Sequence, residues 1–147
     1  MSGAGRTSAI VQRVLPAPPE VVFDEWLDRD ALVEFMSPDP ARASRVECEP
    51  WVGGRYLIEM VNDDSITRMT GEYLELDRPR RLRFSWRSDS HGGFDSEVTV
   101  SLEPTGNDET LMTIDHALPP HLVDDHEQGW NKIAERLATR LAARRMP

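Results

Sequence analysis

His116 is the polar side chain of this sequence best placed to take part in chemistry. It follows Met112 and Ile114 at two-residue intervals, so a β-strand through this segment turns all three toward one face. Histidine on such a face either hydrogen-bonds the polar end of a ligand or acts as a general acid or base. The alternative is a neutral imidazole whose hydrogen bond goes to a backbone or hydroxyl group. Asp115 belongs to the opposite face and cannot orient the ring.

Potential metal ligands crowd the start of the last helical segment, namely His121, Asp124, Asp125, His126 and Glu127. His121 and His126 are five residues apart, whereas helix side chains align at spacings of three or four. Acidic residues are also favoured at helix N-termini by the helix dipole. The sequence therefore predicts neither a metal site nor another cofactor.

Motifs of covalent or nucleotide chemistry are missing from the sequence, which contains no G-x-S-x-G, no P-loop and no G-x-G-x-x-G. Cys48 is the single cysteine, so an internal disulfide is impossible, as suits the reducing cytoplasm. Cys48 lies in phase with Val46, which predicts a buried and inert thiol.

Composition restricts the class of partner. The 147 residues carry a formal net charge of −9, which disfavours nucleic acid and anionic membranes. Apolar residues make up 39% of the chain, and we expect one domain over 8–147 behind a frayed tail at 1–7. The sequence has no run of 18 apolar residues and no signal peptide, which predicts a cytoplasmic protein without membrane spans.

The hydrophobic period changes along the chain from strand to helix and back. Residues 8–15 are predicted as a strand, Pro19 opens a short helix, and a second short helix has Asp30 as its N-cap. A long helix over 121–144 carries one apolar stripe that starts at Trp130. A β-bulge is expected near residues 72–74, where the strand phase switches. Six further strands are predicted at 43–49, 55–61, 66–77, 81–87, 98–102 and 112–116.

The strand predicted over 81–87 shows the clearest alternation. Its apolar members Leu82, Phe84 and Trp86 share one face, and the arginines at 81, 83 and 87 share the other. We expect these arginines to be solvated and to pair with Glu97 across the sheet. A sheet with one apolar face and a helix with one apolar stripe must bury each other. The predicted fold class is therefore α+β, a curved antiparallel sheet around a long C-terminal helix.

A series of short segments between Pro18 and Leu141 points to a family. The segments are Phe23 and Trp26 after Ala-Pro-Pro-Glu, Val52-Gly53-Gly54, Gly71-Glu72, Pro79 with Leu82 and Trp86, Val98 with Val100 and Leu102, Thr110 with Ile114 and His116, and His126 before Gly129-Trp130 and Leu137. In this order they resemble the START-like (SRPBCC) superfamily. The branch they resemble is typified by the C-terminal domain of the activator of the heat-shock-protein-90 ATPase.

The resemblance implies a helix-grip fold with a cavity between the sheet and the long helix. The branch usually ends its second helix with two aromatic residues, where this chain has Phe35-Met36, so a softer cavity mouth is expected. Trp86 and Trp130 should face this space, either as plain core or as cavity lining. The lining expected for the cavity is Trp26, Phe35, Met60, Met69, Trp86, Met112, His116 and Trp130.

Three functions follow from this reading. The first is a non-catalytic module that binds a small hydrophobic molecule, or a co-chaperone-like role with a chaperone partner in the stress response. The second is a small enzyme of cyclase or dehydratase type, in which His116 needs an inward partner such as Arg68, Tyr56 or Tyr73. The third is an interaction protein whose cavity is filled by side chains. The chain is expected to be a monomer or a homodimer.

Overall fold

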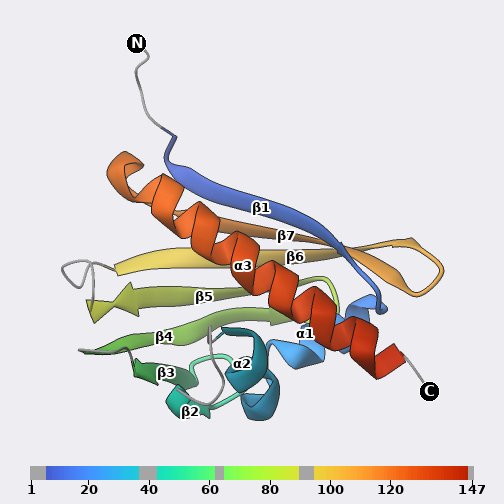
Figure 1. The fold of residues 1–147 in the computed structure, drawn as a ribbon, viewed down its shortest axis with the longest axis horizontal. Helices are drawn as coiled ribbons and strands as arrows, with labels where there is room; N and C mark the ends of the chain where they lie inside the picture. The colour runs from blue at the N-terminus through green and yellow to red at the C-terminus, as the bar shows by residue number, and fades with distance from the viewer. Residues whose placement is uncertain (1–5, 37–42, 62–64, 90–94, 146–147) are drawn as a thin grey trace.

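An antiparallel sheet and a long helix dominate the computed structural model, which describes residues 6–36, 43–61, 65–89 and 95–145 (Figure 1). Seven strands form one sheet in the order β1-β7-β6-β5-β4-β3-β2. This confirms the α+β helix-grip architecture, with two short helices after the first strand. The elements are β1 (Ser8–Leu15), α1 (Pro19–Glu25), α2 (Arg29–Met36), β2 (Ala43–Cys48), β3 (Arg55–Val61), β4 (Ile66–Asp77), β5 (Arg81–Ser88), β6 (Asp95–Gly106), β7 (Glu109–Ala117) and α3 (Pro120–Arg145).

The helix α3 crosses one face of the sheet diagonally, and α1 and α2 lie beside its lower half (Figure 1). Strand side chains alternate between this helix-covered inner face and an outer face. In β5, Leu82, Phe84 and Trp86 are buried, while Arg81 and Arg87 are exposed. The predicted strand phase is therefore confirmed.

Local details of the sheet also follow the sequence. The register of β4 on β5 shifts between Tyr73 and Glu75, which confirms the predicted bulge. Arg83 donates from Nη1 to Glu97 Oε1 at 2.6 Å, which confirms the expected cross-strand pair. Such exposed pairs add little stability and chiefly keep the outer face wet.

Helix side chains cover the free edges of the sheet. At the β1 edge, Glu127 Oε2 of α3 accepts a hydrogen bond from the Ile10 backbone N–H at 3.3 Å. At the β2 edge, Arg29 Nε of α2 donates to the Val46 carbonyl at 2.9 Å. Occupied edge groups discourage pairing with other chains, so the helices protect the sheet as well as its core.

The start of α2 differs from the prediction. Asp28 Oδ1 accepts the backbone N–H groups of Asp30 at 2.9 Å and of Ala31 at 3.4 Å. Asp28 is therefore the N-cap, and the assignment of Asp30 was wrong, because a cap must precede the first-turn N–H groups that it satisfies. Asp30 lies inside the first turn and pairs with Arg29 at 3.0 Å.

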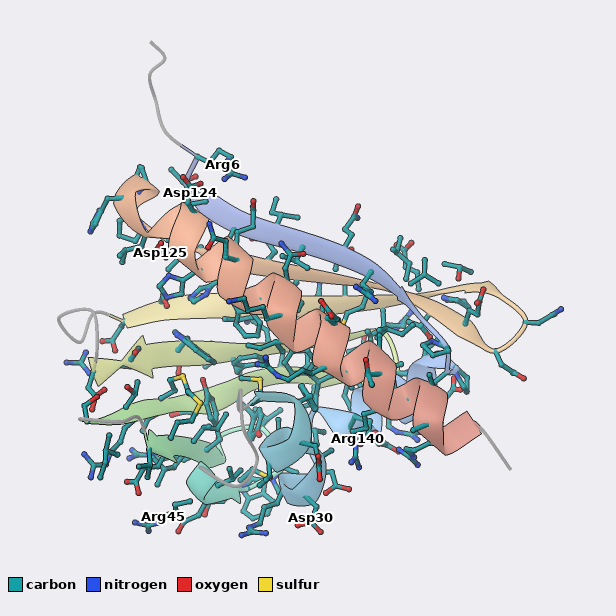
Figure 2. All side chains as sticks on the ribbon, viewed as in Figure 1. Arg6, Asp30, Arg45, Asp124, Asp125 and Arg140 are labelled. Atoms are coloured by element: carbon teal, nitrogen blue, oxygen red, sulfur yellow. The ribbon has the colours of Figure 1, made fainter. Side chains whose placement is uncertain are left out.

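The end of the predicted N-terminal tail contacts the domain where the structure describes it. The Thr7 carbonyl accepts the Leu118 backbone N–H at 2.9 Å. Arg6 forms ion pairs of 2.8 Å with both Asp124 and Glu127 of α3 (Figure 2). Residues 1–5 lie outside the described residues. None of the helices in the described ranges is long and apolar enough to cross a membrane.

A buried carboxylate joins α1 to the end of α3. The side chain of Glu25 is 2% exposed, and its Oε1 accepts from Arg140 Nε at 3.0 Å and from Arg144 Nη1 at 2.7 Å. A buried charge is tolerated only with partners of this kind. The two arginines are one helical turn apart, so both reach the same oxygen.

Replacing Arg140 and Arg144 together by methionine should lower the free energy of unfolding by about 3–5 kcal/mol, because Glu25 then stays buried without a countercharge. Adding Glu25→Leu should restore much of that loss. The matched control, Arg80→Met with Arg81→Met, removes exposed ion pairs and should cost about 1 kcal/mol or less per pair. Urea unfolding measures all four proteins, and a triple variant as unstable as the double variant would contradict this account.

Candidate ligand-binding site

A cavity of about 330 Å³ opens between the first half of α3 and the inner face of β3, β4 and β5. Its volume lies at the lower end of the range for small-molecule sites, and its lining is mostly apolar. Its walls comprise Met36, Met60, Thr67, Met69, Trp86, Ser88, Asp125, His126, Gly129, Trp130, Lys132, Ile133 and Arg136.

Three methionines form the strand and α2 side of the cavity. Met60 of β3 and Met69 of β4 follow the inward phase of their strands, and Met36 is the last residue of α2. Methionine side chains are flexible and polarizable, so they adapt to an occupant more readily than branched residues. Met36, the second residue of the Phe35-Met36 pair considered in the sequence, lies on the cavity wall.

The structure divides the eight residues predicted to line the cavity. Met60, Met69, Trp86 and Trp130 line it. Trp26 instead borders a small void of about 20 Å³ that it shares with Trp86. The remaining three lie deeper in the core and do not reach the cavity lining, namely Phe35, Met112 and His116.

One face of α3 supplies wall residues that the sequence analysis did not single out as cavity lining. Asp125, Gly129, Lys132 and Arg136 recur at intervals of four, three and four residues, which places them on one helix face. That spacing was a visible signal. The spacing did not indicate a cavity wall, because polar residues beside the apolar stripe of a helix ordinarily face solvent.

His116 links α3 to the sheet through both ring nitrogens. Trp130 Nε1 donates to His116 Nδ1 at 3.0 Å, and His116 Nε2 lies 2.7 Å from Ser96 Oγ. An indole only donates, so Nδ1 carries the lone pair and the proton sits on Nε2. Nε2 therefore donates to Ser96, whose hydroxyl donates to the Trp86 carbonyl at 3.0 Å. The chain of bonds runs from α3 through β7 and β6 to β5.

Burial keeps this imidazole neutral. It lowers the pKa of His116 from 6.5 to about 3, and the nearby charge of His126 contributes in the same direction. The inward partners suggested for a catalytic His116 make other contacts: Arg68 donates to Glu59 at 2.8 Å, and Tyr56 donates to the Ser85 carbonyl at 2.6 Å. That suggestion was wrong, because the two ring nitrogens of His116 bond to Trp130 and Ser96.

Two buried indole N–H groups, those of Trp26 and Trp86, have no hydrogen-bond partner among the described residues. Leaving such a donor unpaired costs about 1–3 kcal/mol. Both rings border the void of about 20 Å³, which exceeds the roughly 10–15 Å³ that one water needs. This void, which shares Met36 and Trp86 with the cavity, therefore has room for one water.

Gly129 leaves a gap in the α3 wall. A Cβ added to this residue would meet no heavy atom within 4 Å, so neither close packing nor a neighbouring side chain requires glycine there. Glycine inside a helix costs about 1 kcal/mol relative to alanine. Gly129 is exposed and belongs to the cavity lining, so the helix forgoes stability at a position that borders the cavity.

The polar cluster at the start of α3 is split between different neighbours. Asp124 and Glu127 turn to Arg6, whereas the His126 ring packs against His116 at 5.1 Å between centroids. His126 Nδ1 donates to the Leu122 carbonyl at 2.9 Å. Among the described residues, no three potential ligands lie close enough together to hold a metal ion.

Cys48 is half-buried rather than fully buried as predicted. Its thiol donates to the Leu27 carbonyl at 3.5 Å, and burial raises the pKa of the thiol. A thiol that stays protonated is a weak nucleophile.

A larger hollow of about 650 Å³ lies on the outer face of the sheet across β2 to β6. Its rim is charged, and neighbouring charges already pair, as Arg87 does with Asp95 at 3.0 Å and Arg45 with Glu47 at 2.6 Å. We favour the smaller cavity as the binding site because its lining is mostly apolar and it lies between sheet and helix.

The sequence matches the model of a known protein family. The family model described as Activator of Hsp90 ATPase homolog 1-like protein matches residues 16–142. This chain belongs to that family. The match agrees with the resemblance seen in the sequence and spans strands β2 to β7, the two short helices and most of α3. Among curated protein sequences, none matches the chain significantly.

Solved structures share the fold. A protein from Chromobacterium violaceum is 26% identical over 92% of this chain and 98% of its own, with a TM-score of 0.75. An HSP90 activator from Plasmodium falciparum is 22% identical over 85% of this chain and 88% of its own, with a TM-score of 0.68. CalU16 from Micromonospora echinospora is 22% identical over 92% of this chain and 80% of its own, with a TM-score of 0.69. The likeness to the last two carries the fold alone.

The neutral, buried state of His116 makes stability depend on pH. Between pH 6.5 and about 3 the unfolded chain binds a proton at His116 that the folded chain does not, so stability is lost as pH falls. The loss amounts to at most about 1.4 kcal/mol per pH unit. His116→Gln cannot titrate and should show a shallower dependence by that amount in urea unfolding at several pH values. Equal slopes in the two proteins would contradict the neutral assignment.

Proposed function

We propose that this chain binds a small apolar molecule in the cavity between α3 and β3 to β5, without catalysing a reaction on it. The gap at Gly129 is the observation that carries the proposal. A glycine in mid-helix lowers stability, and here no backbone or side-chain neighbour calls for it. A glycine at this position leaves open space that a ligand can fill.

The chemistry of the lining supports the same function. Met36, Met60 and Met69 present an adaptable apolar surface, and Trp86 and Trp130 add flat aromatic area. The N–H of Trp86, which has no partner among the described residues, offers a donor to an acceptor group. A cavity of about 330 Å³ suits a molecule of one or two rings, or a short aliphatic chain.

Binding is favoured over catalysis because of His116. The catalytic alternative depends on this residue as the acid or base, and its two nitrogens already bond to Trp130 and Ser96. A general base needs a lone pair within reach of the substrate proton. In the hydrogen-bonded arrangement described, the Nδ1 lone pair is occupied by the Trp130 indole.

Gly129→Leu tests the proposal, because the new side chain fills the gap while improving helix propensity. With N-phenyl-1-naphthylamine, a neutral fluorescent apolar probe, the wild-type protein should show saturable binding, and Gly129→Leu should lose about tenfold or more in affinity. The free energy of unfolding should rise by about 0.5–1 kcal/mol in this variant, since leucine is a better helix former than glycine.

Two controls separate cavity filling from helix stabilisation. Gly129→Ala should give the same gain in stability with a smaller loss of probe affinity. Asn131→Leu places leucine on an exposed position of α3 outside the cavity lining, and it should bind the probe as wild type does. A wild-type protein that does not bind the probe, or a Gly129→Leu variant that binds it equally well, would refute the function proposed.

A further inference from the structure

The cavity carries two positive side chains at its α3 wall, Lys132 and Arg136. They lie one helical turn apart and follow Gly129 on the same face. Lys132 is the only lysine in a sequence whose other basic residues, histidines apart, are all arginines. In a chain with a net charge of −9, two cations side by side at an apolar cavity form a local exception.

Neither cation is neutralised by a carboxylate among the described residues. Most described arginines contact one, as Arg83 contacts Glu97 and Arg68 contacts Glu59. Lys132 and Arg136 form no such pair within the described ranges. A cation beside an apolar cavity favours an anion there, and the attraction is stronger at half-buried Arg136, where the surroundings are less polar, than at exposed Lys132.

The hydrogen bonding of the Arg136 guanidinium indicates which kind of group would bind it. It is half-buried, and its Nε donates to the Phe35 carbonyl at 3.0 Å, which fixes the plane of the guanidinium. The two terminal amino groups have no partner among the described residues. Burial lowers the pKa of Arg136, and the charge of Glu135 only partly opposes this effect. A carboxylate matches the remaining edge of a guanidinium through paired hydrogen bonds.

We propose that the ligand of this cavity is an amphipathic carboxylic acid, whose carboxylate binds between Lys132 and Arg136 while its apolar body lies against Met60, Met69 and Trp86. This inference rests on the function proposed above and adds the charge of the ligand to it. Asp125, also on the cavity wall, lies seven residues before Lys132, or about 10 Å along the helix. Its repulsion directs the anionic end away from the start of α3 and toward Arg136.

A matched pair of ligands tests the charge. Decanoate and 1-decanol share an apolar chain and differ in the anionic group, which is ionised at about pH 7.5. In displacement of N-phenyl-1-naphthylamine from the wild-type protein, decanoate should act at roughly tenfold lower concentration than decanol, a preference worth about 1.4 kcal/mol. Raising the salt concentration should reduce that preference, because mobile ions screen the cations.

Variants assign the preference to the two cations. The single variant Lys132→Met, at an exposed position, should lower the preference for decanoate. The double variant Lys132→Met with Arg136→Met should abolish it, so that both ligands displace the probe alike. Arg13→Met removes one positive charge from an exposed position on β1 and should keep the full preference. Circular dichroism of each variant confirms that the protein is folded, and Lys132→Met alone decides the test if the double variant unfolds.

The outcomes separate the two proposals. If the probe binds and is displaced equally by acid and alcohol, the charge inference is overturned and the proposed function stands. If the double variant retains the preference for decanoate, the assignment to Lys132 and Arg136 is overturned. If the wild-type protein binds neither the probe nor either ligand, both proposals are refuted.

Discussion

The hydrogen bond from the Trp130 indole to His116 sets how α3 lies on the sheet. Helix rotation about its own axis decides which residues face the strands, and a buried donor with one acceptor leaves little freedom. With Trp130 held over β7, the rest of the apolar stripe packs on the sheet as Ala134, Leu137 and Leu141. The adjoining face, from Gly129 to Arg136, then becomes the wall of the cavity.

Polar groups inside this protein are of two kinds. Those that hold elements together are satisfied: His116 bonds on both sides, Thr110 donates to the Ala17 carbonyl at 2.7 Å, and Glu25 receives two arginines. The two donors without a partner among the described residues, on Trp26 and Trp86, both border the small void of about 20 Å³. Folding penalises a lone buried donor, so its position marks a place where a further molecule lowers the free energy. The distribution separates scaffold from site without reference to any relative.

The family's fold accommodates many functions, so the chemistry of this member rests on a few residues of its own. Among the residues that line the cavity, Met36 is a flexible apolar residue, Gly129 has no side chain, and Lys132 and Arg136 are positively charged. The overall acidity of the chain acts over longer distances and is screened by salt, whereas charges at an apolar cavity act at contact distance. The local arrangement therefore governs what binds.

The sequence alone determined the elements and their faces, because the periods of strands and helices are local properties. The phase of β5, the bulge after Tyr73 and the stripe from Trp130 to Leu141 all came from spacing. The cap of α2 was misplaced by two residues, because Asp28 and Asp30 offer the same side chain and only the hydrogen bonds distinguish them. Tertiary structure alone decided the partners of His116, the depth of Phe35 and Met112, and the use of a polar helix face as a cavity wall. These features depend on contacts between segments far apart in the chain. A pattern along the sequence predicts which way a side chain points, but it does not predict which group the side chain contacts.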